Sequence, residues 1–135
     1  MGAALAAACD PWWVIGSAAA ALHGARTPVA DIDVLLSVRD AAALLPRLGL
    51  AVAAGRPDDR FRSEVFARWT GAALPIEFMA GLCTREGDAW APVHLSTRVV
   101  VGGVAVPSRR ELAALMRRFG RDKDLARAAL LDAMP

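Results

Sequence analysis

The chain has 135 residues, of which 56% are hydrophobic and 22% charged, with a formal net charge of +2 at neutral pH. That length is typical of one domain with one core, and the apolar content excludes an intrinsically disordered chain. No apolar stretch approaches the roughly 20 residues of a membrane-spanning helix, and nothing at the start resembles a full secretory leader. We therefore expect a single cytoplasmic domain over residues 1–135.

The first part of the chain predicts a helix, a strand and a second helix. Residues 2–9 favour a helix, and residues 12–15 form a short apolar run typical of a buried strand. The strand ends at Gly16, and Ser17 is a suitable N-cap for an alanine-rich helix over 18–23. We expect a strand, a tight turn and a helix in direct succession.

The middle of the chain predicts strands separated by one helix. Residues 30–36 form an apolar strand with two carboxylates, and Ser37 caps a following helix that ends near Pro46. Residues 50–55 are compatible with a short strand, and 62–69 alternate between apolar and polar side chains, as in a half-buried strand.

The C-terminal part predicts one more strand, a hairpin and two helices. Residues 74–79 form an apolar strand, and 98–106 form a hairpin with two glycines at its tip. Ser108 and Glu111 make a capping box for the first helix, and the second helix begins near Asp122. The whole pattern predicts an α/β (α+β) domain with a mixed sheet, flanking helices and two helices at its C-terminal end.

Two carboxylates occur in the strand over 30–36. Asp31 and Asp33 are two residues apart, so their side chains emerge on the same face of the strand. Two adjacent negative charges repel each other, whereas a divalent cation bound by hard oxygen ligands would keep both ionised. The pair is therefore a candidate Mg²⁺ or Mn²⁺ site.

Two further features complement this pair. Glu77 lies among apolar residues of the strand over 74–79, where a charge is costly without a partner and a metal ion would supply one. The Gly16-Ser17 turn opens a helix whose unpaired N–H groups and dipole favour a phosphate, and the Ser17 hydroxyl is a further donor. Together these features suit a metal-bound triphosphate.

The order of these motifs resembles the nucleotidyltransferase superfamily typified by DNA polymerase β. Gly16-Ser17 is followed after thirteen residues by Asp31-Ile32-Asp33, and Glu77 follows on a later strand. With Lys123-Asp124 near the C-terminus, the chain looks like the small bacterial proteins related to the AbiEii-like abortive-infection toxins. It departs from their pattern at Glu77, where Asp is more usual, and at Met116, where a lysine is frequent.

The resemblance implies transfer of a nucleoside monophosphate from a nucleoside triphosphate to an acceptor hydroxyl. It assigns metal binding and catalysis to Asp31, Asp33 and Glu77, with Glu77 as a ligand of the second ion or as the base, and the two aspartates alone also suffice for a metal. The residues implied to bind the nucleotide are Gly16, Ser17, Lys123 with Asp124, and, as a weaker candidate, Arg26. The acceptor is open between RNA, a protein and a small molecule, and the implied partners are an antitoxin or a second copy of the chain.

Two alternatives stay open on the sequence. The departures at Glu77 and Met116 are compatible with a catalytically inactive module of the same fold that binds a nucleotide or a protein. Arginines in the C-terminal helices are compatible with an RNA-binding module without chemistry. Each residue also has a plain structural explanation, such as N-capping for Ser17 and a solvent-facing strand edge for Glu77.

Overall fold

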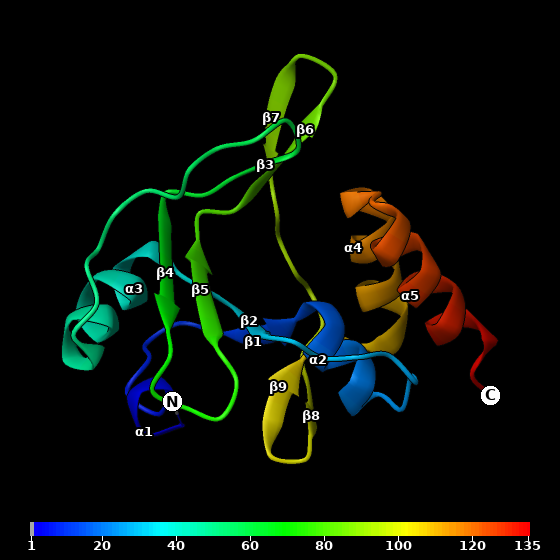
Figure 1. The fold of residues 1–135 in the computed structure, drawn as a ribbon, viewed down its shortest axis with the longest axis horizontal. Helices are drawn as coiled ribbons and strands as arrows, with labels where there is room; N and C mark the ends of the chain where they lie inside the picture. Colours follow the sequence, from blue (N-terminus) through cyan, green and yellow to red (C-terminus); the bar gives the residue numbers. More distant parts are fainter. Residues whose placement is uncertain (1) are drawn as a thin grey trace.

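A four-stranded sheet forms the centre of the molecule in the computed structural model, which describes residues 2–135 (Figure 1). The strands are β1 (Trp13–Ile15), β2 (Ile32–Leu36), β5 (Ile76–Ala80) and β4 (Val65–Trp69), in that order across the sheet. β2 and β5 are parallel, and the two outer pairs are antiparallel. The predicted mixed sheet is confirmed.

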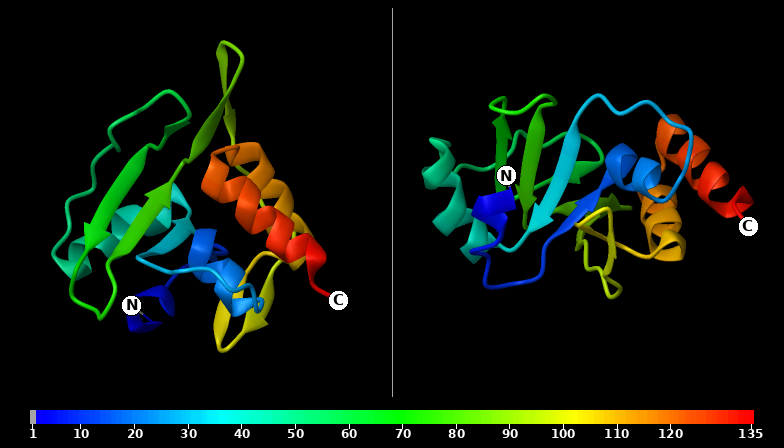
Figure 2. Two further views of the ribbon diagram at one scale, coloured as in Figure 1. Left: turned by 45° about the vertical axis from the view of Figure 1, so that its right-hand side comes forward. Right: turned by 90° about the horizontal axis from the view of Figure 1, so that it is seen from below.

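The helices pack against this sheet, most of them through the hydrophobic cluster that contains Val34 of β2 (Figures 1 and 2). They are α1 (Gly2–Leu5), α2 (Gly16–Leu22), α3 (Val38–Leu44), α4 (Arg109–Phe119) and α5 (Asp122–Ala133), and a short 3₁₀ helix, η1 (Leu45–Leu48), continues α3. α4 and α5 pack against each other and contact α2, whereas α3 contacts β5. The two predicted C-terminal helices are present. No helix within residues 2–135 has the length and apolar character needed to cross a membrane.

The sequence prediction was wrong for some local elements. The segment 50–55 is not a strand, because its backbone makes isolated hydrogen bonds and no continuous ladder: Leu50 N donates to the Leu45 carbonyl, Gly55 N to the Ser63 carbonyl, and Ala53 O accepts from Phe66 N. The predicted helix over 2–9 ends at Leu5.

The predicted strand over 62–69 is two strands. β3 (Phe61–Arg62) pairs with a small second sheet, and β4 pairs with β5 in the main sheet. The chain changes sheets between them, so a continuous strand was the wrong interpretation.

That second sheet contains a hairpin that the sequence analysis did not predict. Its strands are β6 (Cys83–Glu86) and β7 (Ala89–Pro92), and it extends away from the main sheet (Figure 1). Arg118 in α4 donates hydrogen bonds to Thr84 Oγ1 at 2.7 Å and to the carbonyls of Ala91 and Pro92 at 2.8 and 2.9 Å. These bonds attach the base of the hairpin to the helical layer.

The hairpin predicted over 98–106 is confirmed. It consists of β8 (Val99–Val101) and β9 (Val104–Val106). Gly102 and Gly103 both have positive φ, 58° and 78°, as the tight two-residue turn requires.

Two hydrophobic clusters lie on opposite faces of β2. Val34 and Leu36 belong to the larger cluster, and Leu35 belongs to the smaller one with Ile15 and Phe119. Because side chains alternate along a strand, Asp33 shares the face of Leu35. The carboxylate is therefore directed toward the smaller cluster.

One side of α5 is buried in the core. Ala128 and Leu131 are buried, whereas Leu125 is 46% exposed and Leu130 is 41% exposed. The buried side of the helix also carries Asp124, which is 1% exposed. A carboxylate in the core requires a partner, and that partner lies in the pocket described next.

Candidate active site

Three carboxylates converge because of the strand pairing at the centre of the sheet. Asp33 in β2 is opposite Glu77 in the parallel strand β5, and it is also opposite Ile15 in β1. Asp31 immediately precedes β2, two residues before Asp33. One strand register thus brings together residues that are 44 positions apart in the sequence.

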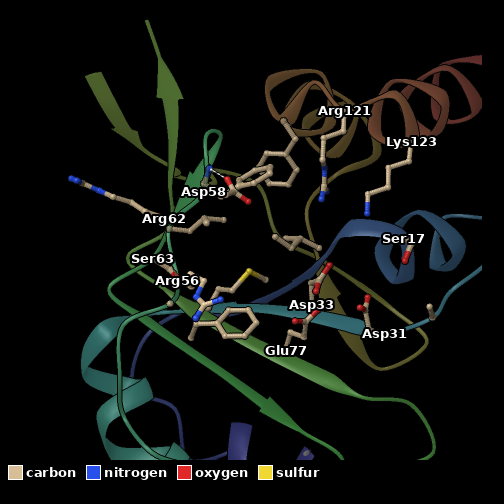
Figure 3. Close-up of a pocket in the computed structure, with 18 of the residues that line it drawn as sticks. Ser17, Asp31, Asp33, Arg56, Asp58, Arg62, Ser63, Glu77, Arg121 and Lys123 are labelled. Atoms are coloured by element: carbon tan, nitrogen blue, oxygen red, sulfur yellow. Dashed lines mark hydrogen bonds between the residues drawn. The ribbon is translucent and has the colours of Figure 1, made fainter. Parts of the chain in front are cut away.

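The carboxylates are close enough to share an ion. Asp31, Asp33 and Glu77 each contribute one oxygen, and these oxygens all lie within 4.8 Å of one another. Figure 3 shows the three side chains directed into one pocket. The pocket has a volume of about 610 Å³, within the usual range for small-molecule sites.

Burial and charge repulsion disfavour the ionised forms of Asp33 and Glu77. Burial raises the pKa of Asp33 to about 7, with further contributions from the charges of Asp31 and Glu77. Burial also raises the pKa of Glu77, together with a hydrogen bond and charge repulsion from Asp31, while Arg68 and Lys123 oppose the shift. Because burial and the neighbouring charges raise the pKa of Asp33 and of Glu77, a bound cation would displace protons from these two carboxylates.

Gly16 packs directly against this cluster. Its φ is +68°, and a Cβ atom at this position would lie 2.6 Å from Asp33 Oδ2. Only glycine combines that backbone conformation with so close an approach. The glycine of the predicted Gly-Ser turn is thus explained by its contact with Asp33.

Ser17 lies within α2, so the prediction that it caps the helix was wrong. The N-cap is Ile15, and no side chain caps this end. Ser17 is 6% exposed and lines the pocket opposite the carboxylates (Figure 3). Ser17 therefore shares a pocket with the carboxylates without capping the helix.

Two cations from the start of α5 also line the pocket. Lys123 was singled out from the sequence, and Arg121 was not (Figure 3). Arg121 donates from Nε and Nη2 to Asp124 at 2.6 and 3.0 Å, and its guanidinium lies 5.0 Å from the centre of the Phe61 ring. The guanidinium is thus held in place beside the carboxylates.

Asp124 does not line the pocket, although the sequence analysis placed it at the nucleotide. It is buried, accepts two side-chain bonds from Arg121, and also accepts the Arg121 backbone N–H at 3.3 Å. Arg121 is the N-cap of α5 and Asp124 its third residue, so this is a form of capping box. An Arg-x-x-Asp pattern at a helix start was the sequence signal for Arg121.

Two other positions lie outside the pocket. Arg26 is exposed and is not among the residues that line it. Met116 is fully buried in the larger hydrophobic cluster. A lysine at position 116 would therefore need a different packing of α4 to reach the carboxylates.

A wall of the pocket comes from the irregular segment before β4, which the sequence analysis did not connect with the site. The irregular parts of this stretch contribute Gly55, Arg56, Asp58 and Ser63, β3 contributes Phe61 and Arg62, and the start of β4 contributes Phe66. Figure 3 shows Arg56, Arg62 and Ser63 on the side of the carboxylates away from Ser17 and Lys123. The pocket thus has cations on both sides of an acidic centre.

Solved structures with a similar fold include one that is described as a nucleotidyltransferase. A candidate nucleotidyltransferase from Thermotoga maritima, TM1012, has a TM-score of 0.74 at 22% identity, with 88% of this chain and 80% of that chain covered. The antibiotic-resistance factor ANT(2'')-Ia has a TM-score of 0.58 at 14% identity, with 96% and 77% covered. In complex with adenylyl-2''-tobramycin, ANT(2'')-Ia gives 0.56 at 14% identity, with 96% and 82% covered.

The chain therefore has the fold of the nucleotidyltransferases, as predicted from its motifs. No protein-family model matches the sequence, and no curated protein matches it at a significant level.

Proposed function

We propose that the protein is a metal-dependent nucleotidyltransferase that moves a nucleoside monophosphate from a nucleoside triphosphate to an acceptor hydroxyl. The observation that carries this proposal is the convergence of Asp31, Asp33 and Glu77 within 4.8 Å. The cluster lies in a pocket that Ser17 and Lys123 also line. The shared fold supports the same reaction class.

The donor set fits Mg²⁺ or Mn²⁺. Carboxylate oxygens are the ligands that these hard cations prefer, and three of them lie within reach of one ion. The raised pKa of Asp33 indicates that the cations of the protein itself leave the cluster incompletely neutralised. When bound, a divalent ion would polarise the phosphoryl group and neutralise charge on the attacking and leaving oxygens.

On the side of Ser17, the pocket suits the leaving pyrophosphate. The Ser17 hydroxyl is a hydrogen-bond donor, and Lys123 and Arg121 carry positive charge toward the same space (Figure 3). We propose that Gly16, because it has no side chain, allows the Asp33 carboxylate to lie close to the backbone. Asp124 acts as a positioning residue through Arg121, and Arg26, outside the pocket, has no part in the proposal.

The proposed reaction is a single in-line displacement at the α-phosphorus, in which one bond to phosphorus forms and one breaks. The acceptor oxygen forms a bond to the α-phosphorus, and the bond from this phosphorus to the oxygen bridging to the β-phosphorus breaks. In the alternative in which Asp31 and Asp33 alone hold the metal ion, the Glu77 carboxylate takes the hydroxyl proton and later releases it to water. The products are the nucleotidylated acceptor and pyrophosphate.

Transfer of label from each α-labelled nucleoside triphosphate tests the proposal. With Mg²⁺ or Mn²⁺ and a mixture of acceptors, we expect label transfer that Asp33→Asn reduces at least about 100-fold, as loss of a metal ligand does. Asp88→Asn, which removes the same charge from the exposed turn between β6 and β7, is the control. Equal transfer by both variants would contradict the proposal.

A second function has one observation in its favour. Arg68 Nη1 lies 3.8 Å from Glu77 Oε2, so the third carboxylate has a cationic partner in the neighbouring strand. A module that binds the metal–nucleotide complex without transferring it would use the same pocket. Metal-dependent nucleotide binding without release of pyrophosphate, with any acceptor, would favour this function.

A toxin–antitoxin role is a narrower proposal. It depends on the resemblance of two segments, residues 12–37 and the segment around Lys123-Asp124, to AbiEii-like proteins, and it implies either an antitoxin or a second copy as a partner. Growth arrest on expression of the protein, abolished by Asp33→Asn and relieved by the product of an adjacent gene, is the expected result. Unimpaired growth with the active protein would contradict it.

A further inference from the structure

Strand β8 presents an apolar edge at the surface of the molecule. Within residues 2–135, β8 pairs with β9 alone, and the two strands form a sheet of their own. Figure 1 shows this hairpin at the end of the molecule opposite the hairpin of β6 and β7. β8 consists of Val99, Val100 and Val101, and Val100 is 67% exposed. Natural proteins usually protect such an edge with a charged residue or a proline, because strand edges pair with other chains.

Other outer strands of the molecule have that protection. The irregular segment 50–55 covers part of the edge of β4, where Phe66 N donates to the Ala53 carbonyl at 2.9 Å. β7 contains Pro92, and Arg118 donates to the carbonyls of Ala91 and Pro92. β8 has neither a charged residue nor a proline. The contrast identifies β8 as an edge that is suited to pairing.

The register of the hairpin determines which backbone groups point outward from β8. Gly102 and Gly103 form a two-residue turn, so Val101 and Val104 are a hydrogen-bonded pair. Hydrogen-bonded and non-hydrogen-bonded pairs alternate along an antiparallel ladder, so the N–H and C=O of Val100 point away from β9. In the part of the chain that the structure describes, neither group bonds to backbone outside the hairpin.

The edge is held in place by contacts at both ends of the hairpin. Val106 in β9 is fully buried in the larger hydrophobic cluster. Just before β8, Glu111 accepts the backbone N–H of Thr97 at 2.8 Å, and Arg98 Nε donates to the Trp12 carbonyl at 3.1 Å. A partner strand would therefore meet an edge that is already ordered, and association would cost little conformational entropy in this protein.

The edge of β8 is complementary to itself. In antiparallel pairing about a two-fold axis at Val100, each Val100 faces the other, and Val99 of one copy faces Val101 of the other. Each Val100 then donates its N–H to the carbonyl of the other Val100. The next position places Arg98 opposite Gly102, which has no side chain, so no like charges face each other. A second copy thus fits this edge without burying a charge.

We propose that two copies of the chain associate by antiparallel pairing of their β8 strands, which joins the two hairpins into one four-stranded sheet across a two-fold axis at Val100. This inference goes beyond the proposed function and does not depend on it, because no residue of β8 or β9 lines the carboxylate pocket. Pairing over one short strand buries less than the standard interface of about 1,600 Å². We therefore expect a reversible dimer whose population depends on protein concentration.

Sedimentation of the full chain over roughly a hundredfold range of concentration around the micromolar range tests this pairing. We expect the wild type to shift from monomer to dimer. Val100→Lys places two like charges side by side at the axis and should weaken association at least about tenfold. The matched control is Val52→Lys, the same substitution at a valine that is 44% exposed in the segment 50–55. It should dimerise as the wild type does.

A second pair of variants tests the two-fold axis itself. Val100→Glu alone should weaken association as Val100→Lys does. An equimolar mixture of the two variants should recover association as a mixed dimer, because opposite charges then face each other across the axis. Anisotropy of one fluorescently labelled variant follows this recovery. A substitution that only perturbed the fold of β8 would not be rescued by mixing.

The outcomes separate this inference from the proposed function. A wild type that is monomeric throughout the concentration range would overturn it, even if the monomer bound an extended segment of another protein at this edge. A dimer that Val100→Lys leaves intact, or a mixture of the two charged variants that stays monomeric, would also overturn it. Asp33→Asn should dimerise as the wild type does, so loss of nucleotide transfer has no bearing on the pairing.

Discussion

Gly16 and Asp33 are in such close contact that the glycine leaves no room for a Cβ atom, which would lie 2.6 Å from Asp33 Oδ2. We expect Gly16→Ala to displace the carboxylate and to weaken metal-dependent nucleotide binding at least about tenfold, measured by calorimetry. The control is Gly49→Ala, because Gly49 has a similar φ of +73° but no atom within 4 Å of the added Cβ.

Both alanine variants introduce left-handed strain of about 1–2 kcal/mol, so both should unfold at lower denaturant concentration than the wild type. Only Gly16→Ala should lose nucleotide affinity. Equal affinity in the two variants would show that Gly16 has only a backbone role.

The raised pKa of Asp33 predicts a pH-dependent stability in the absence of metal. Burial, with the charges of Asp31 and Glu77, raises this pKa from 3.8 to about 7. Because the folded state holds the proton more tightly than the unfolded chain, the free energy of unfolding falls as pH rises between these values and stays low above them.

We therefore expect Asp33→Asn in EDTA to raise the Tm at pH 8, by an amount corresponding to about 1–3 kcal/mol, and to change it little near pH 4. Excess Mg²⁺ should stabilise the wild type at pH 8 and leave the variant unchanged. Asp88→Asn, in an exposed turn, is the control. If Asp33→Asn is less stable than the wild type at pH 8 in EDTA, the ionised Asp33 carboxylate does not destabilise the fold, contrary to this prediction.

Asp124 is predicted to act through Arg121. Asp124→Asn should lower the free energy of unfolding by about 1–3 kcal/mol, because a buried charge-assisted pair loses one partner. It should also raise KM for the nucleoside triphosphate, because the Arg121 guanidinium is no longer held. Asp122→Asn is the matched control, since Asp122 is an exposed carboxylate in the same first helical turn.

Arg121→Lys distinguishes the binding role of Arg121 from its structural role. It keeps a positive charge but cannot reproduce the two-point contact with Asp124. We expect it to raise KM for the nucleotide while retaining the helix. A normal KM in both Asp124→Asn and Arg121→Lys would place the pair outside the nucleotide site.

Glu111 attaches the segment before β8 to the start of α4. Its carboxylate accepts the backbone N–H groups of Ser96 and Thr97 at 2.8 Å each and both of their hydroxyls. Burial alone would raise the pKa of Glu111, but the hydrogen bonds from Thr97 and Ser96 outweigh burial and lower it. This stabilisation is therefore present at neutral pH and is lost as pH falls through the lowered pKa.

We expect Glu111→Gln to lower the free energy of unfolding at pH 7 by about 1–2 kcal/mol, with a smaller difference near pH 3. A double-mutant cycle with Thr97→Val should give a favourable coupling between the two side chains. Additive effects in that cycle would show that the two groups stabilise the fold independently.

Period-two patterning in 30–36 was enough to predict that Asp31 and Asp33 share a face, since that follows from strand geometry alone. The place of Glu77 beside them depends on the parallel register of β2 and β5, which no local pattern encodes. The resemblance to a known motif order supplied that long-range information.

The sequence around the other residues of the pocket has no hydrophobic periodicity from which their position could be predicted. Arg56 lies in an irregular segment, and β6 and β7 are short and largely exposed, so hydrophobic alternation could not indicate them. Arg121 pairs locally with Asp124, three residues on, but its place in the site also depends on stacking against Phe61, a residue far away in the sequence. Side-chain orientation of this kind is decided by tertiary packing.

The central claim is that the three carboxylates bind a divalent ion that in turn holds a nucleoside triphosphate. Titration of a nonhydrolysable nucleoside triphosphate into the protein by calorimetry, in Mg²⁺ and in EDTA, tests it most directly. We predict binding in Mg²⁺, none in EDTA, and none in either condition for Asp31→Asn/Asp33→Asn. Equal binding in EDTA, or undiminished binding by the double variant, would contradict the claim.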